Sequence, residues 1–477
     1  MDVVEIQPTK STLLLCGSLL FAALFIACDS AAPKQLSAPA SAAVGPLVAG
    51  DYEGVNIVIV SIDTLRADHL GLYGYRRDTS PHLDILAKDA ITFERARAPR
   101  GLTWPSLVSM FTSLYPRSSN VRRNGDLLAD DVPTLASLLQ ERGYETAAFL
   151  GNACGVFTRN FDTSYCGTDE AVQRNALKWI DKPKNGPFLL WVHYKAPHEE
   201  YLPPAKFDRF TDPGYAGKAT GKRDYLDRVT LSQKAPTEED LAHVVGLYDG
   251  EVLYSDALMH QVTEALKKRD LLDSSIFVFT SDHGEELLQH NNYYYHSCSV
   301  YEAVHHIPLV IRLPDRKRSG QRVHGIVENI DIAPTLLELI GETPPDGFEG
   351  QTLRPLINED EGVEARFNSA IAEYHRHDTG WIGTIRTDRW HYIYNPDGVT
   401  PVCRPQSDYF KVRQEELYDH SKDPLEQLNV AIEHQELVAR LRAQLLDEVS
   451  RQRDYEPAER ADPRVIEQLK AMGYLVE

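Results

Sequence analysis

Three residues of metal-ligand type follow two apolar segments of the sequence. Asp63 comes directly after the β-branched run at residues 55–62, and Asp282 and His283 follow the run at residues 275–281. Carboxylate oxygens and an imidazole nitrogen are ligands for Ca²⁺, Mg²⁺ or Mn²⁺, and also for Zn²⁺. One aspartate at a strand end is more often a turn former. The two segments together predict one divalent metal site held by Asp63, Asp282 and His283.

A hydroxyl residue stands at the start of a predicted helix. Thr103-Trp104-Pro105-Ser106 leads into the apolar residues 107–111, and an early proline is typical of a helix start. One interpretation is that Thr103 only caps this helix. The other is that the free N–H groups and positive dipole end bind a sulfuryl or phosphoryl group beside Thr103.

The segments between these motifs alternate between strand and helix patterns. Apolar, β-branched runs such as residues 55–62 are typical of strands buried on both faces of a parallel sheet, and helical spacing follows in between, for example at residues 238–269. Parallel strands place ligands beyond their carboxyl ends, which suits Asp63 and Asp282. We expect an α/β fold with a large mixed, mostly parallel sheet sandwiched by helices.

A Pro- and Gly-rich stretch at residues 343–350 predicts a boundary. We expect a catalytic domain at residues 54–345 and a C-terminal subdomain at residues 346–477. Three strand patterns and one helical pattern in the second part predict a small antiparallel sheet with a packed helix. They lie at residues 370–374, 383–386, 391–394 and 433–452.

The N-terminus has the pattern of a bacterial lipoprotein signal. An apolar run after Lys10 ends at Phe25-Ile26-Ala27-Cys28, which resembles a lipobox, and residues 30–50 are rich in Ala, Ser and Pro. We predict a signal peptide at residues 1–27, lipidation of Cys28 and a flexible tether at residues 28–53. The alternative is a signal-anchor helix, but the apolar run is short for a bilayer span. The prediction places the protein on the periplasmic or cell-surface face of a membrane.

The amino-acid composition limits the classes of molecule that the protein is expected to bind. The chain has 477 residues and a formal net charge of −20, so it lacks the basic surface of a nucleic-acid binder. A small anionic ester remains compatible, because a metal and a few basic residues set the local field. Cys154 and Cys166 bracket one short loop, where a disulfide and two free thiols are equally good interpretations.

Four segments resemble motifs of one family. They are residues 58–74 (VIVSIDTLRADHLGLYG), 248–251 (YDGE), 280–285 (TSDHGE) and 416–419 (ELYD), the last followed by Asp423-Pro424. In that order they resemble the opening metal-binding strand, the start of the central helix, the second metal motif and the C-terminal signature of the sulfatase family, within the alkaline-phosphatase-like superfamily. The resemblance covers residues 54–477. It implies a hydrolase that binds a divalent metal and acts on a sulfate or phosphate ester.

The sequence departs from the family at the nucleophile. Family sulfatases convert a cysteine to formylglycine, and Thr103 stands in that place here, with Leu107 where an arginine often follows. Threonine cannot become formylglycine. It is the nucleophile in phosphodiesterases and phosphoethanolamine transferases of the superfamily, so the resemblance implies Thr103 as candidate nucleophile. Ile62 replaces the family's second aspartate, and Ser119-Asn120 replaces a common His-Gly pair.

The resemblance also suggests further site residues. Residues 191–198 are similar to the family's His-x-x-x-Pro-His segment, which implies His193 and His198 as catalytic residues that donate a proton or bind ester oxygens. His296 matches a family histidine that follows the second metal motif, and we expect it to bind substrate. Arg123 is a candidate anion contact, although loop arginines are usually solvated.

Three functions remain open from the sequence. The first is a metal-dependent hydrolase of a sulfate or phosphate ester, whose substrate is a small anionic ester or a sulfated or phosphorylated glycan or lipid. The second is a transferase that moves a phospho-substituent such as phosphoethanolamine onto a cell-envelope acceptor. The third is a degenerate family member that binds without catalysis, which the intact ligand residues Asp63, Asp282 and His283 disfavour.

Overall fold

The structure is a computed structural model that describes residues 45–151, 155, 160–232, 234–291, 293–376, 380–403, 410–453, 455 and 467. Ser41–Glu477 form one compact unit. The predicted signal peptide, Cys28 and the first part of the tether lie outside the described residues and stay predictions. In the described part of the chain, every helix is too short or too polar to span a bilayer.

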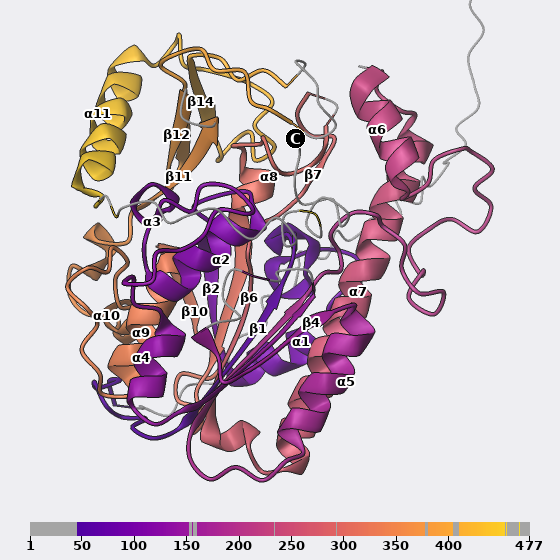
Figure 1. Cartoon of the computed structure of the whole chain (residues 1–477). Helices are drawn as coiled ribbons and strands as arrows, with labels where there is room; N and C mark the ends of the chain where they lie inside the picture. Colours follow the sequence, from indigo (N-terminus) through magenta and orange to yellow (C-terminus); the bar gives the residue numbers. More distant parts are fainter. Residues whose placement is uncertain are drawn as a thin grey trace, which may run out of the picture. The chain divides into compact units, whose positions relative to one another are not determined.

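A mixed eight-stranded sheet forms the centre of this unit (Figure 1). Its strand order is β10-β2-β9-β6-β1-β5-β3-β4. Strand β9 runs antiparallel to both of its neighbours, and the other neighbouring pairs are parallel. The strands are β1 Asn56–Ile62, β2 Ile91–Arg97, β3 Glu145–Gly151, β4 Thr163–Gly167, β5 Phe188–Tyr194, β6 Ser275–Ser281, β9 His306–Arg312 and β10 Arg322–Glu328.

Two hydrophobic cores lie on the two faces of this sheet. Every residue of β1 is buried, and its side chains alternate between the cores: Ile57 and Ile59 face one, Val58 and Val60 the other. Helices α2, α4 and α9 cover the first face, and α1, α5 and α7 cover the second (Figure 1). These helices are α1 Pro81–Leu86, α2 Thr103–Thr112, α4 Leu135–Glu141, α5 Asp169–Ile180, α7 Glu238–Lys268 and α9 Ile332–Leu339.

A second, antiparallel sheet lies in the C-terminal part, with strand order β11-β12-β13-β14. Helix α11, Gln435–Arg451, packs on it through Leu441 and Leu445, which share a core with Ile385 and Leu417. The strands are β11 Ser369–Arg376, β12 Gly380–Thr387, β13 Trp390–Tyr394 and β14 Glu415–Asp419. The predicted fold class is confirmed, whereas the predicted domain boundary stays a prediction.

The remaining elements are short apart from α6. They are α3 Pro116–Ser119, α6 Arg223–Ser232, α8 Glu302–His305, α10 Arg354–Asn358, β7 Glu286–Leu287 and β8 Tyr294–Tyr295, with 3-10 helices at Ala67–His69, Gly71–Tyr73, Ala87–Asp89, Leu272–Ser274, Asn329–Asp331 and Val363–Ala365. Strands β7 and β8 pair with each other in the segment that follows β6.

Candidate active site

Asp63 and Asp282 follow neighbouring strands at the same end of the large sheet. Strands β1 and β6 pair in parallel with Ile62 opposite Ser281, so the two aspartates leave the sheet side by side. His283 Nε2 lies 3.8 Å from Asp63 Oδ1 and 3.5 Å from Asp282 Oδ2. All three side chains are fully buried, and their ligand atoms lie within 4.8 Å of one another. We call these residues the ligand trio.

The hydrogen bonds around the ligand trio leave two acceptor atoms, Asp282 Oδ2 and His283 Nε2, close to each other. His283 Nδ1 lies 2.9 Å from the Gly284 carbonyl oxygen, so Nδ1 carries the proton and Nε2 presents its lone pair. Asp282 Oδ1 accepts from the N–H groups of Thr64 and His283, whereas its Oδ2 has no hydrogen-bond donor among the described residues. Burial lowers the pKa of His283, which favours the neutral ring.

This arrangement fits a divalent cation. Two buried carboxylates and an imidazole lone pair repel one another unless a positive charge lies between them. Oxygen and nitrogen donors of this kind suit Ca²⁺, Mg²⁺, Mn²⁺ or Zn²⁺. The residues predicted as metal ligands are therefore together, and the identity of the metal stays open.

Thr103 is the first residue of helix α2 and is fully buried. Its Oγ1 lies 3.5 Å from His283 Nε2. The N-cap residue is Leu102, whose side chain makes no capping hydrogen bond, so Thr103 is not the N-cap. Ser106 Oγ donates to the Asp282 carbonyl oxygen at 2.5 Å, which fixes the helix start against the ligand trio. The Thr103 hydroxyl is thus positioned beside the predicted metal site.

Two of the predicted histidines gather around His283. The His296 ring lies 4.4 Å from the His283 ring and 5.1 Å from the His198 ring, measured between centroids. Glu285 Oε1 holds His296 Nδ1 at 2.9 Å, and Glu199 Oε2 lies 2.6 Å from His198 Nδ1. The Nδ1 atom of each imidazole therefore lies beside a buried carboxylate, and His198 Nδ1 also lies 2.9 Å from the Glu199 carbonyl oxygen.

His193 and Arg123 have other contacts. His193 lies on β5 and shares a hydrogen bond of 2.8 Å with Ser61 Oγ, opposite it on β1. Burial lowers the pKa of His193 to about 4, which makes it a poor proton donor near neutral pH. Arg123 Nη2 lies 3.3 Å from Asp126 Oδ1, and 32% of the Arg123 side chain is exposed. The predicted roles of His193 and Arg123 stay predictions.

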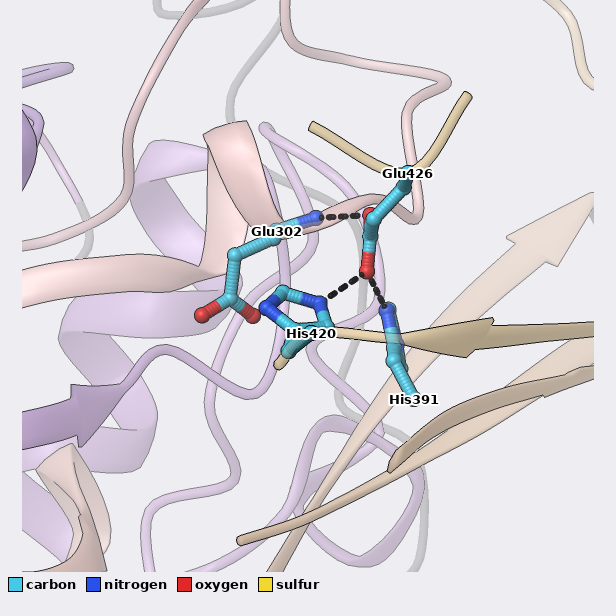
Figure 2. Close-up of side chains that lie close together, drawn as sticks. All are labelled: Glu302, His391, His420 and Glu426. Atoms are coloured by element: carbon cyan, nitrogen blue, oxygen red, sulfur yellow. Dashed lines mark hydrogen bonds and ion pairs between the residues drawn. The ribbon is translucent and has the colours of Figure 1, made fainter. Parts of the chain in front are cut away.

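A second group of ligand-type side chains lies between helix α8 and the small antiparallel sheet. Figure 2 shows His391 Nδ1 and His420 Nε2 both directed at Glu426 Oε1, while the Glu302 N–H donates to Glu426 Oε2 at 2.8 Å. The ligand atoms of these four residues lie within 4.8 Å of one another. We call this group the Glu426 cluster.

The charges of the Glu426 cluster are already balanced by the protein. Although burial by itself raises the pKa of Glu426, His391 and His420 hold it well below its usual value. Glu302 Oε1 lies 2.5 Å from Arg97 Nη2, and its Oε2 lies 3.5 Å from Arg386 Nε. Two guanidinium groups would repel a cation here. The cluster is better explained as an ion-pair network that links β13 and β14 to α8.

Comparison with known proteins identifies the family. The family model described as Sulfatase matches residues 55–342, and the model described as N-sulphoglucosamine sulphohydrolase, C-terminal, matches residues 290–453. The chain belongs to the sulfatase family. The resemblance to this family is confirmed, and with it the expectation of a sulfuric or phosphoric ester hydrolase.

Curated relatives of this sulfatase-family chain carry sulfatase names. Arylsulfatase K of Xenopus laevis is 27% identical over 413 residues, which cover 74% of this chain and 74% of the relative. N-acetylglucosamine-6-O-sulfatase of Bacteroides thetaiotaomicron is 23% identical over 510 residues and covers 85% of this chain and 88% of the relative.

Solved structures of sulfatases and of phosphonate hydrolases share its fold. A phosphonate monoester hydrolase of Agrobacterium radiobacter has a TM-score of 0.67 at 20% identity and covers 83% of this chain and 95% of its own. A second solved structure, in complex with its substrate D-glucosamine-2-N,6-O-disulfate, also has a TM-score of 0.67 at 20% identity. The match covers 84% of this chain and 99% of that chain.

Several features of the sulfatase site were not predicted from the sequence. Glu285, the last residue of the second metal motif, orients His296, and Asn124 Oδ1 accepts from the Trp104 N–H at 2.9 Å. A disulfide joins Cys298 to Cys403, 105 residues apart. The Cys154–Cys166 pairing stays untested, because Cys154 lies outside the described residues. The Glu285 and Asn124 side chains act through contacts in space that residue spacing does not reveal.

Proposed function

We propose that this sulfatase-family enzyme hydrolyses a sulfate or phosphate ester outside the cytoplasm, with one divalent metal and with Thr103 as nucleophile. The observation that supports this most is the position of Thr103 Oγ1, 3.5 Å from His283 Nε2 at the edge of the ligand trio. This position supports the proposal, because a metal beside a hydroxyl group activates it as a nucleophile.

The ligand trio would hold the metal, which when bound lowers the pKa of a neighbouring hydroxyl and offsets negative charge on the ester. Thr103 Oγ1 attacks the phosphorus or sulfur atom, forms a Thr103 ester and breaks the bond to the leaving oxygen. His198 and His296 are the candidates to accept the Thr103 proton and to protonate that leaving oxygen. Water then cleaves the Thr103 ester and restores the hydroxyl.

Thr103 stands where family sulfatases have the modifiable cysteine, and this replacement favours a phosphorus ester over a sulfate ester as the substrate. A formylglycine hydrate releases sulfate by breaking its own C–O bond, a route that a threonine ester lacks. Against this, the relatives named arylsulfatase K and N-acetylglucosamine-6-O-sulfatase favour a sulfated substrate, and the likeness to a phosphonate monoester hydrolase extends only to the fold. Sulfate and phosphorus esters are therefore both included in the assay that tests the proposal.

The decisive experiment is a parallel assay of an aryl sulfate, a phosphate monoester, a phosphodiester and a phosphonate monoester. Parent protein, Thr103→Ala and Thr103→Ser are compared, each with its metal content measured. We expect Thr103→Ala to lose at least 100-fold in kcat/KM while it keeps its metal, and Thr103→Ser to retain part of the activity. Equal rates for Thr103→Ala and parent would remove Thr103 from the mechanism. Addition of an alcohol acceptor separates hydrolysis from transfer.

Export and anchoring are part of the same proposal. The lipobox-like residues 25–28 and the tether support a mature N-terminus at Cys28. We expect the protein to label with radioactive palmitate in a bacterial host and Cys28→Ser to abolish the label. A labelled Cys28→Ser variant would show that this cysteine is not the anchor.

A further inference from the structure

Arg100 is a buried cation three residues before Thr103, in the loop between β2 and α2. Only 2% of the residue is exposed. Its Nη2 donates to the Ser297 carbonyl oxygen at 3.2 Å. Its Nε and Nη1 are buried and make no hydrogen bond to any described residue. A buried guanidinium with two unpaired donor nitrogens is costly, and such a group calls for an oxygen ligand.

The protein around Arg100 supplies little opposite charge. The guanidinium carbon lies 4.6 Å from the centre of the Tyr374 ring, a cation–π contact. Glu373 is the acid whose charge acts on Arg100, but its carboxylate accepts from Trp381 Nε1 at 2.9 Å and from Arg117 Nε at 3.3 Å. Burial lowers the pKa of Arg100 to about 10, so the side chain is still charged at neutral pH.

The Arg100 side chain lies beside the active site. Ser297, its hydrogen-bond acceptor, directly follows His296. The next residue in the loop is Gly101, where a Cβ atom would meet Val304 Cγ1 at 2.4 Å and the His296 carbonyl oxygen at 3.3 Å, so the loop can pack this closely only with glycine. The positive charge of Arg100 also reaches His283, whose pKa it helps to lower.

The loop after His296 and the C-terminal part of the chain together fix the surroundings of Arg100. The disulfide Cys298–Cys403 ties the loop after His296 to the C-terminal part. The Val402 N–H, next to that disulfide, donates to the Tyr374 hydroxyl at 2.7 Å. The carbonyl that Arg100 contacts and the ring that it stacks on are thus held in one frame, which fixes the position of the guanidinium and of its two free donor nitrogens.

We propose that Arg100 binds an oxyanion of the substrate through its Nε and Nη1 atoms. The inference rests on the proposed function for the location of the reacting group. The oxyanion has two sources: the ester group that is cleaved, or a second sulfate, phosphate or carboxylate on the same substrate. Arg100 is in either case a binding residue contributed by the loop that leads into Thr103.

The test compares parent protein with Arg100→Met, Arg100→Lys and the control Arg142→Met. Arg142 is a surface residue, 59% exposed in its side chain and paired with Glu342. Inorganic phosphate and inorganic sulfate are used as probes in calorimetric titration and thermal unfolding, which need no turnover. Kinetics then use substrate pairs that differ by one remote anionic group.

We expect Arg100→Met to weaken binding of phosphate or sulfate, or to raise KM for substrates with a second anion, by about 10- to 100-fold. Arg100→Lys is expected to fall in between, and Arg142→Met to match the parent. Weaker binding of inorganic anions assigns the cleaved group as the source, and a KM effect limited to doubly anionic substrates assigns the remote group.

A purely structural role for Arg100 predicts a different result. In that case Arg100→Met lowers the unfolding temperature in anion-free buffer, and its anion binding and KM equal those of the parent, which overturns the proposal. If the proposed function fails instead, Thr103→Ala stays active while the effects of Arg100→Met on anion binding persist. The two failures are therefore distinguishable.

Discussion

Thr103 Oγ1 lies 3.5 Å from His283 Nε2, although the two residues are 180 positions apart in the chain. His283 comes from the end of β6, and Thr103 from the first turn of α2. Ser106 lies in the first turn of the same helix, and its Oγ donates a hydrogen bond to the Asp282 carbonyl oxygen. The helix start and the strand end are thus tied together by contacts across the site.

The ligand trio should hold roughly one divalent metal ion per chain. Asp282→Asn removes one negative ligand from a fully buried group, so we expect its metal content to fall at least tenfold. Elemental analysis after dialysis measures this. Stoichiometric metal in the Asp282→Asn variant would exclude the trio as the binding site.

Glu426→Gln should leave the metal content unchanged and reduce stability. Glu426 is 2% exposed and accepts hydrogen bonds from both His391 and His420, so loss of its charge leaves this ion-pair network unbalanced. We expect a loss of about 3 kcal/mol in the free energy of unfolding by urea. A loss of metal in this variant would instead make the Glu426 cluster a second metal site.

Asn124→Ala should impair catalysis without loss of metal. The Asn124 side chain satisfies the N–H of the fully buried Trp104, next to Thr103. Without it we expect a stability loss of about 1–2 kcal/mol and a drop in kcat, since a buried donor is left unpaired. Asn124→Asp keeps the acceptor oxygen and serves as control. A normal kcat in Asn124→Ala would show that Thr103 is positioned by other contacts.

The buried Glu251 on α7 should make stability fall as pH rises. Burial raises the pKa of Glu251 to about 8 from its usual 4.5. Between these two values the folded state binds more protons than the unfolded state, so stability is highest below pH 4.5 and is lost up to about pH 8. Glu251→Gln removes this dependence. We expect it to stabilise the protein relative to the parent by a few kcal/mol at pH 8 and by little at pH 5. An identical difference at both pH values would contradict the raised pKa.

The disulfide Cys298–Cys403 closes a loop with a sequence separation of 105 residues. Its loss in a Cys298→Ser/Cys403→Ser double variant should lower the free energy of unfolding by about 2–5 kcal/mol, because the unfolded chain gains freedom. Urea titrations with and without a thiol reductant measure this. The double variant should not respond to the reductant at this site, and an equal response in both proteins would assign the effect to another bond.

The strands that precede the ligands were readable from the sequence, because β1 and β6 consist mostly of β-branched or aromatic residues and each is followed directly by an aspartate. Strands β2 (ITFERAR) and β10 (RVHGIVE) were not predicted. Their charged residues hide the strand pattern. Arg97 of β2 is buried nonetheless, since Glu302 on α8 pairs with it, and a partner this distant leaves no local signal.

The candidate site also contains residues that the sequence pattern reveals and residues that it does not. Asp63, Asp282 and His283 could be found because parallel strand ends meet at one edge of a sheet. The environment of Arg100 could not, since it depends on a carbonyl at position 297 and a ring at position 374. The disulfide partner of Cys298 was equally hidden by the distance along the chain.

The ligand trio and the candidate nucleophile belong to different secondary structures, and this separation has an evolutionary consequence. A change of position 103 to cysteine or serine would leave the strand ends that hold the ligand trio untouched. One substitution at position 103 would in this way exchange one ester chemistry for another, while the fold and the ligand trio stay the same.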